Sequence, residues 1–270
     1  MDPIDAQPWT LDNLDFSRVE VARIRHDEDL FLLLCAASFA ESAAQPRMHD
    51  LVEAFAGDRE WQAWLRQCWQ PEKWQHGHAL AAYVRHVWPE FDWQAGFRAW
   101  LDAQAPVSTA PLERSLALAA RCVAAAGAAS HYRALGEAAG EPVLRQLAGC
   151  LKRDEVRHFN RFCQQLRICR EQEGLGRRPL LRALLAQARA GRVPAHEAAL
   201  RHVFGQCHPD RRDDTAFAQA AARVHARLRP HLAAGTTARM LLKPLDLPPR
   251  LQSLLEKPLV RYGHRLLPGY

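Results

Sequence analysis

The chain has 270 residues, of which 48% are hydrophobic and 14 are glycine, so the composition excludes a disordered or collagen-like protein. At this length it can bury a large core as one domain, or as one domain with an appendage. The net charge is +6, but only four of the 36 basic residues are Lys, and acids lie among the arginines. Because there is no basic run, zinc-finger spacing or RNA-binding aromatic motif, we expect no nucleic-acid partner.

Signals for membrane insertion, secretion and disulfide formation are missing from the sequence. No run of about 18 apolar residues occurs, so we expect no transmembrane segment. The first seven residues are acidic and lack an apolar centre, so we expect no signal peptide. Seven cysteines form an odd set without a Cys-x-x-Cys pair, and most lie in apolar helical stretches. These features predict a reduced protein in the cytoplasm.

Hydrophobic periodicity predicts an all-α fold along almost the whole chain. Prolines and glycines divide the pattern: Pro46 follows the first helix, Pro89 follows the third, and 174–176 form a Gly-Leu-Gly linker. In chain order the expected helices cover residues 27–44, 58–68, 72–87, 91–103, 112–135, 141–171, 179–190, 195–206 and 213–233.

The region beyond these helices carries little periodicity. The tail from Thr236 contains five prolines, and we expect it to lie over the surface of the bundle. We therefore expect residues 1–172 to form a helical bundle with an N-terminal extension. Residues 173–270 should add C-terminal helices and a proline-rich tail, packed on the bundle as part of one structural domain.

Acid-and-histidine pairs occur on two of the long predicted helices. Glu155 and His158 are three residues apart, so on a helix they lie one turn apart on the same side and could grip one metal ion. Glu72 and His76 form a second pair at a spacing of four. Glu41 lies in an otherwise apolar helix interior, where an isolated carboxylate is costly unless it is paired or bound to metal. One such pair also arises by chance on a solvated helix face, so the interpretation depends on the pairs occurring together.

The residues around these pairs resemble the two metal-binding helices of the ferritin-like superfamily. The resemblance is carried by the runs Trp69-x-x-Glu72-x-x-x-His76-Gly77 and Asp154-Glu155-x-Arg157-His158. It is closest to acyl-acyl-carrier-protein desaturases and related bacterial ferritin-like proteins, and it covers roughly residues 28–170. It implies a four-helix bundle whose helices supply, in order, a Glu, a Glu-x-x-His, a Glu and a second Glu-x-x-His to two iron ions. The residues on matching positions are Glu41, His76, Glu155 and His158.

Two positions depart from that pattern. Lys73 stands where the second helix should carry its Glu, three residues before His76, although the neighbouring Glu72 could swing in as a substitute. The third helix should carry a Glu near Ala125, yet no acid occurs between Glu113 and Glu137. Two ferrous ions carry four positive charges, and at most three carboxylates remain to neutralise them. We therefore expect a single iron ion or none.

Two functions follow from the resemblance. The first is an O2-dependent oxidoreductase of the desaturase or oxygenase type, which acts on an apolar or acyl-type substrate and has a degenerate metal site. The second is a non-catalytic ferritin-like binding or interaction protein that has lost the di-iron centre. The candidate metal ligands are Glu41, Glu72, His76, Glu155 and His158, with His131 as a further nitrogen donor.

The implied partner is an apolar small molecule or an acidic acyl carrier protein. Acyl carrier proteins would be attracted by the basic charge of the chain. The arginines that we expect to steer one are Arg177, Arg178, Arg211 and Arg212. The sequence also leaves a homodimer open.

Overall fold

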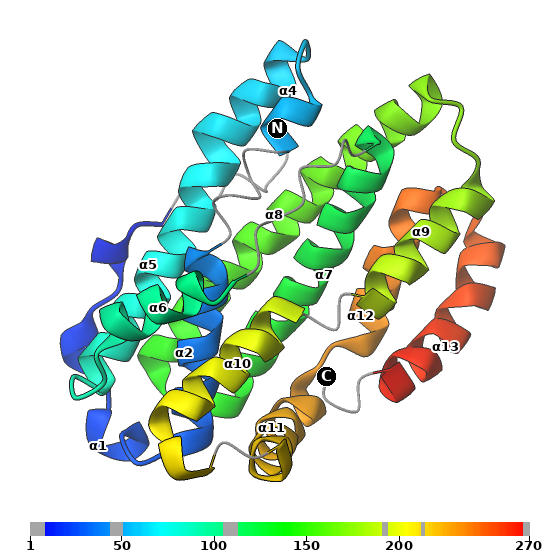
Figure 1. The fold of residues 1–270 in the computed structure, drawn as a ribbon. Helices are drawn as coiled ribbons and strands as arrows, with labels where there is room; N and C mark the ends of the chain where they lie inside the picture. Colours follow the sequence, from blue (N-terminus) through cyan, green and yellow to red (C-terminus); the bar gives the residue numbers. More distant parts are fainter. Residues whose placement is uncertain (1–8, 44–50, 105–112, 191–193, 212–213, 267–270) are drawn as a thin grey trace.

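The computed structural model describes residues 9–43, 51–104, 113–190, 194–211 and 214–266, and every regular element in that part of the chain is helical (Figure 1). The all-α prediction is therefore confirmed. No helix among these residues is long and apolar enough to cross a membrane. The α-helices are α1 (Val21–Ile24), α2 (Glu28–Ser42), α4 (Arg59–Trp64), α5 (Gln70–Val87), α6 (Trp93–Asp102), α7 (Arg114–Ala139), α8 (Pro142–Gln172), α9 (Arg177–Ala190), α10 (Pro194–Cys207), α11 (Asp214–Leu228), α12 (Ala234–Leu242) and α13 (Pro249–Leu266).

Acidic side chains cap the starts of two of the helices that build the site, α2 and α8. Asp27 accepts a hydrogen bond from the backbone N–H of Leu30, at the start of α2. Glu141 precedes Pro142 and accepts from two backbone N–H groups of the first turn of α8. The first N–H groups of a helix have no partner within it, so such caps fix where each helix begins. A proline at the first position loses nothing, because its missing N–H would have had no partner there.

The expected break between residues 58–68 and 72–87 is wrong. α4, a π-helical stretch (Leu65–Trp69) and α5 follow one another without interruption. The N–H of Gln70 bonds to the carbonyl of Leu65, five residues back, as in a π turn. Pro71 has no N–H, and its ring would crowd the carbonyl four residues earlier in a regular α-helix. The wider π turn before the proline accounts for a helix that continues through it.

The chain beyond Thr236, where the sequence shows little periodicity, is largely helical in the structure. It contains α12, a short 3-10 turn (Lys243–Leu245) and α13. Pro244 and Pro249 lie at the starts of the 3-10 turn and of α13, where proline is compatible with helical geometry. These prolines mark helix starts and do not exclude helices.

Four helices carry the candidate site. α2 packs along α5, α7 packs along α8, and α5 contacts α8 (Figure 1). α7 and α8 form a hairpin at Gly140, whose φ of 67° is a left-handed conformation that closes the end of α7. α10 and α11 lie against α2, and α9 and α12 lie against α7.

Buried polar residues of α8 lie between two apolar clusters. The first cluster includes Leu144, Leu147 and Leu151 on α8. The second includes Phe159 and Phe162, farther along the same helix, together with tryptophans of the α4 region. The three residues between them on the inward face are Asp154, Glu155 and His158, which follow Leu151 at i+3, i+4 and i+7. The site is therefore a polar layer across an otherwise apolar core.

The close approach of α5 to the end of α2 depends on Gly77. A Cβ atom at that position would lie 2.7 Å from Oγ of Ser42 and 3.0 Å from its backbone N and Cα. Contacts this short require the two helices to separate. Gly77 follows His76 directly, and Ser42 follows Glu41, so the same close contact sets the spacing of two site residues.

We expect Gly77→Ala to lower the free energy of unfolding by about 1–3 kcal/mol, because the added methyl group overpacks the α2–α5 contact. The matched control is Gly127→Ala in α7, where an added Cβ meets no atom within 4 Å. That control should raise stability by about 1 kcal/mol through helix propensity alone. Urea denaturation of both variants measures these changes. Stabilisation by Gly77→Ala would contradict the packing described above.

Candidate metal centre

Three helices bring eight ionisable side chains together in the polar layer. α2 supplies Glu41, and α5 supplies Glu72, Lys73 and His76. α8 supplies the remaining four, which are Asp154, Glu155, Arg157 and His158. Glu41, His76, Asp154, Glu155 and His158 are all at most 6% exposed. Buried charges at this density persist only when each has a partner of opposite charge or a hydrogen bond.

The Lys73 ammonium lies at the centre of the cluster. It contacts Oε2 of Glu41, and its Nζ atom is 2.8 Å from Oε1 of Glu155. One positive charge therefore joins carboxylates of α2 and α8 from a helix that packs between them. Lys73 points inward and takes the position that a metal ion would hold between the two acids.

The titration of these groups reflects their mutual attraction. Burial alone would lower the pKa of Lys73, but the charges of Glu155 and Glu41 outweigh it and raise that pKa above its ordinary 10.5. Burial alone would raise the pKa of Glu155, but the Lys73 charge and the two histidine rings beside the carboxylate hold it well below 4.5. The pKa of Glu41 is lowered in the same way, against burial, mainly by Lys73. The three groups are therefore charged together at neutral pH.

His76 is held by an acid on the side away from Lys73. Its Nε2 atom is 3.0 Å from Oδ2 of Asp154, and its Nδ1 atom is 3.5 Å from Oε1 of Glu155. The indole N–H of Trp9 donates to the same Oδ2 atom of Asp154 at 2.7 Å. Burial would lower the pKa of His76, but the hydrogen bond with Asp154 and the nearby Glu155 carboxylate raise it above 6.5. The ring is thereby fixed with Nδ1 facing the cluster.

His158 repeats this arrangement. Its Nε2 atom is 2.6 Å from Oε2 of Glu72, and its Nδ1 atom is 3.7 Å from Oε2 of Glu155. Arg157 joins the two supporting acids, at 2.6 Å from Oε1 of Glu72 and 2.9 Å from Oδ1 of Asp154. Each imidazole therefore bonds to a carboxylate through its Nε2 atom, and Arg157 forms ion pairs with both of these carboxylates.

Several buried atoms of the cluster lack hydrogen bonds. They are Nδ1 of His76, Nδ1 of His158 and Oε2 of Glu41, which forms an ion pair with Lys73. Glu41, His76 and Glu155 each offer a ligand atom within 4.8 Å of the other two, the one such group of three among the described residues. Metal-ligating histidines commonly have their second ring nitrogen bonded to a carboxylate, as both histidines do here. The donor set therefore fits one metal ion.

A pair of metal ions does not fit. Two carboxylates, Glu41 and Glu155, face the centre, and Lys73 already neutralises one of their two negative charges. α7 presents Ala125, and Tyr132 supplies a hydroxyl that donates to Oε1 of Glu41 at 2.5 Å. Four positive charges from two divalent ions would remain largely uncompensated.

Four of the sequence-predicted ligands come together, and two predicted donors do not join them. Glu41, His76 and Glu155 converge, with His158 beside Glu155. Glu72 lies on the side of His158 away from Glu155 and bonds to Nε2 of that ring. His131 is buried against His196, with ring centroids 5.3 Å apart. Burial chiefly, with the nearby His196 and His225, lowers the pKa of His131 to about 3.

Sequence reasoning missed four supporting residues: Asp154, Arg157, Trp9 and Tyr132. Asp154 was not among the predicted site residues, yet it lies three residues after Leu151 and four before His158, on the buried face. The helical spacing alone could have placed it there. Trp9 and Tyr132 reach the cluster from distant parts of the chain, so no local pattern reveals them.

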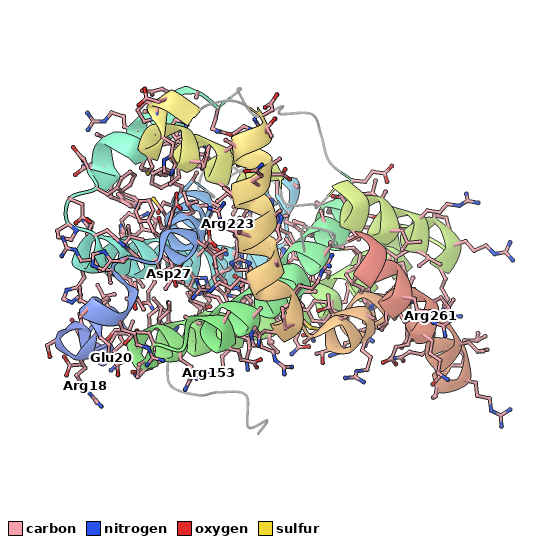
Figure 2. The ribbon with its side chains drawn as sticks, turned by 90° about the horizontal axis from the view of Figure 1, so that it is seen from below. Arg18, Glu20, Asp27, Arg153, Arg223 and Arg261 are labelled. Atoms are coloured by element: carbon pink, nitrogen blue, oxygen red, sulfur yellow. The ribbon has the colours of Figure 1, made fainter. Side chains whose placement is uncertain are left out.

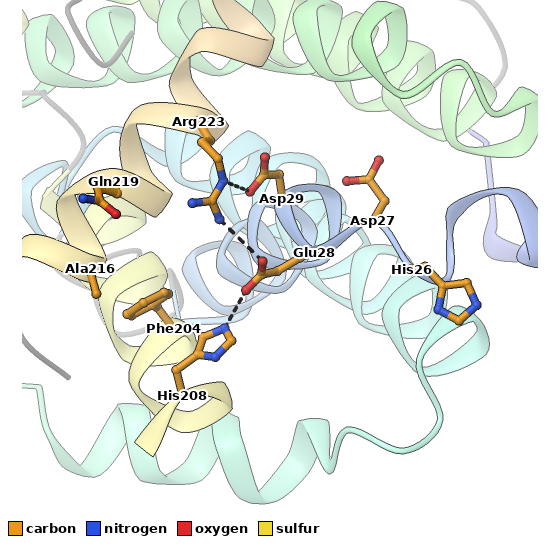
Figure 3. Close-up of a pocket in the computed structure, with 9 residues that line it drawn as sticks. All are labelled: His26, Asp27, Glu28, Asp29, Phe204, His208, Ala216, Gln219 and Arg223. Carbon is orange, nitrogen blue, oxygen red and sulfur yellow. Dashed lines mark hydrogen bonds and ion pairs between the residues drawn. The ribbon is translucent and has the colours of Figure 1, made fainter. Parts of the chain in front are cut away.

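A second polar hollow lies at the other end of α2 (Figure 3). Its volume is about 360 Å³, and it is lined by Asp27, Glu28, Asp29, His208 and Arg223, among others. His208 lies 2.6 Å from Glu28, and Arg223 donates to Asp29 at 3.1 Å. Glu28 and Glu41 are 13 residues apart on one helix, a distance of about 20 Å. The hollow is therefore separate from the carboxylate–histidine cluster.

No family model matches the chain, and no curated protein matches its sequence. The resemblance to ferritin-like proteins therefore stays a prediction from the sequence.

Replacing Lys73 tests how much its ion pairs with Glu41 and Glu155 contribute to the stability of the fold. We expect Lys73→Met to lower the free energy of unfolding at pH 7 by roughly 3–5 kcal/mol, because two buried carboxylates lose their cation. The folded-state pKa values of Glu41 and Glu155 are lowered, so their stabilisation is complete above about pH 4.5 and is lost as pH falls through the folded values. Wild type and variant should therefore converge in stability below pH 4.5.

Urea denaturation from pH 3 to pH 9 tests this expectation. The control is Lys257→Met on the exposed face of α13, which should change stability by less than about 0.5 kcal/mol. A loss of stability in Lys73→Met that stays the same at every pH would contradict the ion-pair account.

Proposed function

We propose that this chain is a ferritin-like helical-bundle protein of the oxidoreductase type that binds one transition-metal ion through Glu41, His76 and Glu155. The observation that carries the proposal is the common orientation of two imidazoles. His76 and His158 each bond to an acid through Nε2 and turn Nδ1 toward Glu155. A cluster that served packing alone would gain nothing from two buried ring nitrogens without hydrogen bonds.

Charge balance supports one ion. With neutral histidines, the inner acids Glu41 and Glu155 carry two negative charges, which match one divalent cation when the Lys73 ammonium withdraws. Lys73 is 12% exposed at its side chain and carries four rotatable methylene groups, so it has a route toward solvent. In this proposal Lys73 holds the two acids until a metal ion replaces its ammonium.

The surrounding residues prepare the ligands for that exchange. Asp154 and Glu72 accept hydrogen bonds from the Nε2 atoms of His76 and His158 and so leave the Nδ1 atoms free to coordinate a metal ion. Tyr132 orients Glu41, and Trp9 lies stacked on His76 with ring centroids 6.3 Å apart, which keeps water from the ring. A redox-active ion such as iron would supply one-electron transfer and activation of dioxygen at this position.

An apolar or acyl-type substrate is part of the same proposal. Apolar clusters lie on both sides of the polar layer along α8, so an acyl chain near the site would contact apolar side chains. Delivery by an acyl carrier protein remains a prediction. Of the arginines expected to steer one, Arg177 donates to backbone oxygens of Leu245 and Asp246. The side chains of Arg211 and Arg212 lie outside the described residues.

One observation favours a second candidate function. Lys73 already forms ion pairs with both inner carboxylates, so a cation lies between them without a metal. In that case the chain is a non-catalytic binding or interaction protein whose buried ion pairs fix the register of its helices. Metal affinity separates the two candidates.

We expect wild-type protein to bind at most one Co²⁺ per chain, and Lys73→Met to bind it at least about tenfold more tightly, because the competing ammonium is gone. Co²⁺ is a useful probe because its visible absorption reports nitrogen ligation. Titration followed by absorption and elemental analysis gives both affinity and stoichiometry.

Two further variants complete the experiment. Adding Glu155→Gln to Lys73→Met should abolish binding, because it removes the carboxylate ligand that lies between the two histidines. Lys152→Met, on the same helix as Glu155, should leave binding unchanged. Two tightly bound ions per wild-type chain would overturn the proposal, and binding only after Lys73 is replaced would favour the interaction protein.

A further inference from the structure

The C-terminal helix α13 exposes an unusual group of leucines. Leu251, Leu254 and Leu255 are 49%, 69% and 37% exposed, and they fall within five consecutive positions. They are three of the eight large hydrophobic side chains that are exposed among the described residues, so the exposure is concentrated on this helix. We call these three residues the leucine face of α13.

The opposite side of α13 is the one that packs on the protein. The helix contacts α12, and its Glu256 lies 3.3 Å from Arg239 of α12. Leu259 packs against the second apolar cluster. At about 100° per residue, Leu251, Leu254 and Leu255 occupy an arc of about 100°, and Leu259 lies beyond that arc toward the bundle. The leucine face is therefore directed away from the core by the packing of the helix.

Basic side chains flank the leucine face along one edge. Arg250, Lys257 and Arg261 are exposed and project within about 40° of one another around the helix. Arg261 lies at the outer edge of the molecule, beyond the helices that build the site (Figure 2). We call these three residues the basic flank.

The charge of the whole C-terminal region points the same way. Residues 173–270 contain 17 Lys and Arg against 7 Asp and Glu, a net charge of +10. Residues 1–172 contain 19 against 23, a net charge of −4. The basic character of the chain is therefore confined to the third that carries α13.

We propose that α13 binds the surface of an anionic lipid membrane, with the leucine face inserted among the lipids and the basic flank on their head groups. A basic amphipathic helix with leucines on one face is the form that lies in the plane of a membrane interface. Anionic lipids attract each Lys or Arg near their surface by a factor of roughly five in affinity. A second copy of the chain fits less well, because a two-fold contact through this face would bring two basic flanks together.

The test uses the full-length protein and sedimentation with vesicles. Vesicles of phosphatidylcholine with about one third phosphatidylserine should bind the protein at least tenfold more tightly than phosphatidylcholine alone, and added salt should weaken the binding. The triple variant Leu251→Ser, Leu254→Ser, Leu255→Ser should lose tenfold or more in affinity. Its control, Leu101→Ser on the exposed side of α6, should bind as wild type does.

A charge-matched pair of variants tests the basic flank. Lys257→Glu with Arg261→Glu should lose tenfold or more in vesicle affinity. Arg18→Glu with Arg145→Glu makes the same change in net charge at exposed positions elsewhere and should lose much less. All changed residues are exposed, so circular dichroism should show folded protein throughout.

Three results would overturn the proposal. The first is equal binding to both kinds of vesicle, or none at low ionic strength. The second is an equal loss in the two charge variants, which would mean that only net charge matters. The third is a wild-type dimer that the leucine variant converts to a monomer while its vesicle binding is unchanged, which would assign the leucine face to self-association.

Discussion

The Lys73 ammonium, held between Glu41 and Glu155, is the interaction on which the rest of the bundle depends. It joins α2, α5 and α8 at one buried point, and α7 reaches the same point through Tyr132. Two desolvated carboxylates this close would repel each other strongly without a cation between them. The packing of the four helices therefore depends on the composition of the site, since the helices can approach only if a positive charge is present.

The polar layer also constrains how the helices align. Apolar clusters on either side can tolerate small shifts, because dispersion and burial have no direction. The carboxylate–imidazole pairs cannot, since a slip of one turn between α5 and α8 would leave His76 and His158 without Asp154 and Glu72. Gly77 permits the matching approach of α5 to α2. Specific pairing in the centre and close packing beside it together define a single arrangement.

Local rules were enough to predict most of the helices and an inward Glu41. The Glu141-Pro142 start and the apolar surroundings of Glu41 carry their own physical reasons, and both hold in the structure. Prolines misled the prediction twice, because Pro71 is accommodated by a π turn and Pro249 begins a helix. The resemblance placed Lys73 at the position of a ligand Glu, but its ion pairs with two acids on other helices could not be predicted from that position. Trp9 likewise reaches Asp154 across 145 residues of sequence.

The central claim is that the Lys73 ammonium and a metal ion compete for the same two carboxylates. Nitrogen-15 NMR of the lysine ammonium groups tests it most directly, because a buried, hydrogen-bonded ammonium exchanges its protons with water slowly enough to be observed at neutral pH. The account predicts one slowly exchanging signal in metal-free protein, absent from Lys73→Met and lost from wild type in proportion to added Zn²⁺ up to one equivalent. A Lys73 signal that is missing from metal-free protein, or that persists unchanged after one Zn²⁺ ion has bound to the cluster, would contradict it.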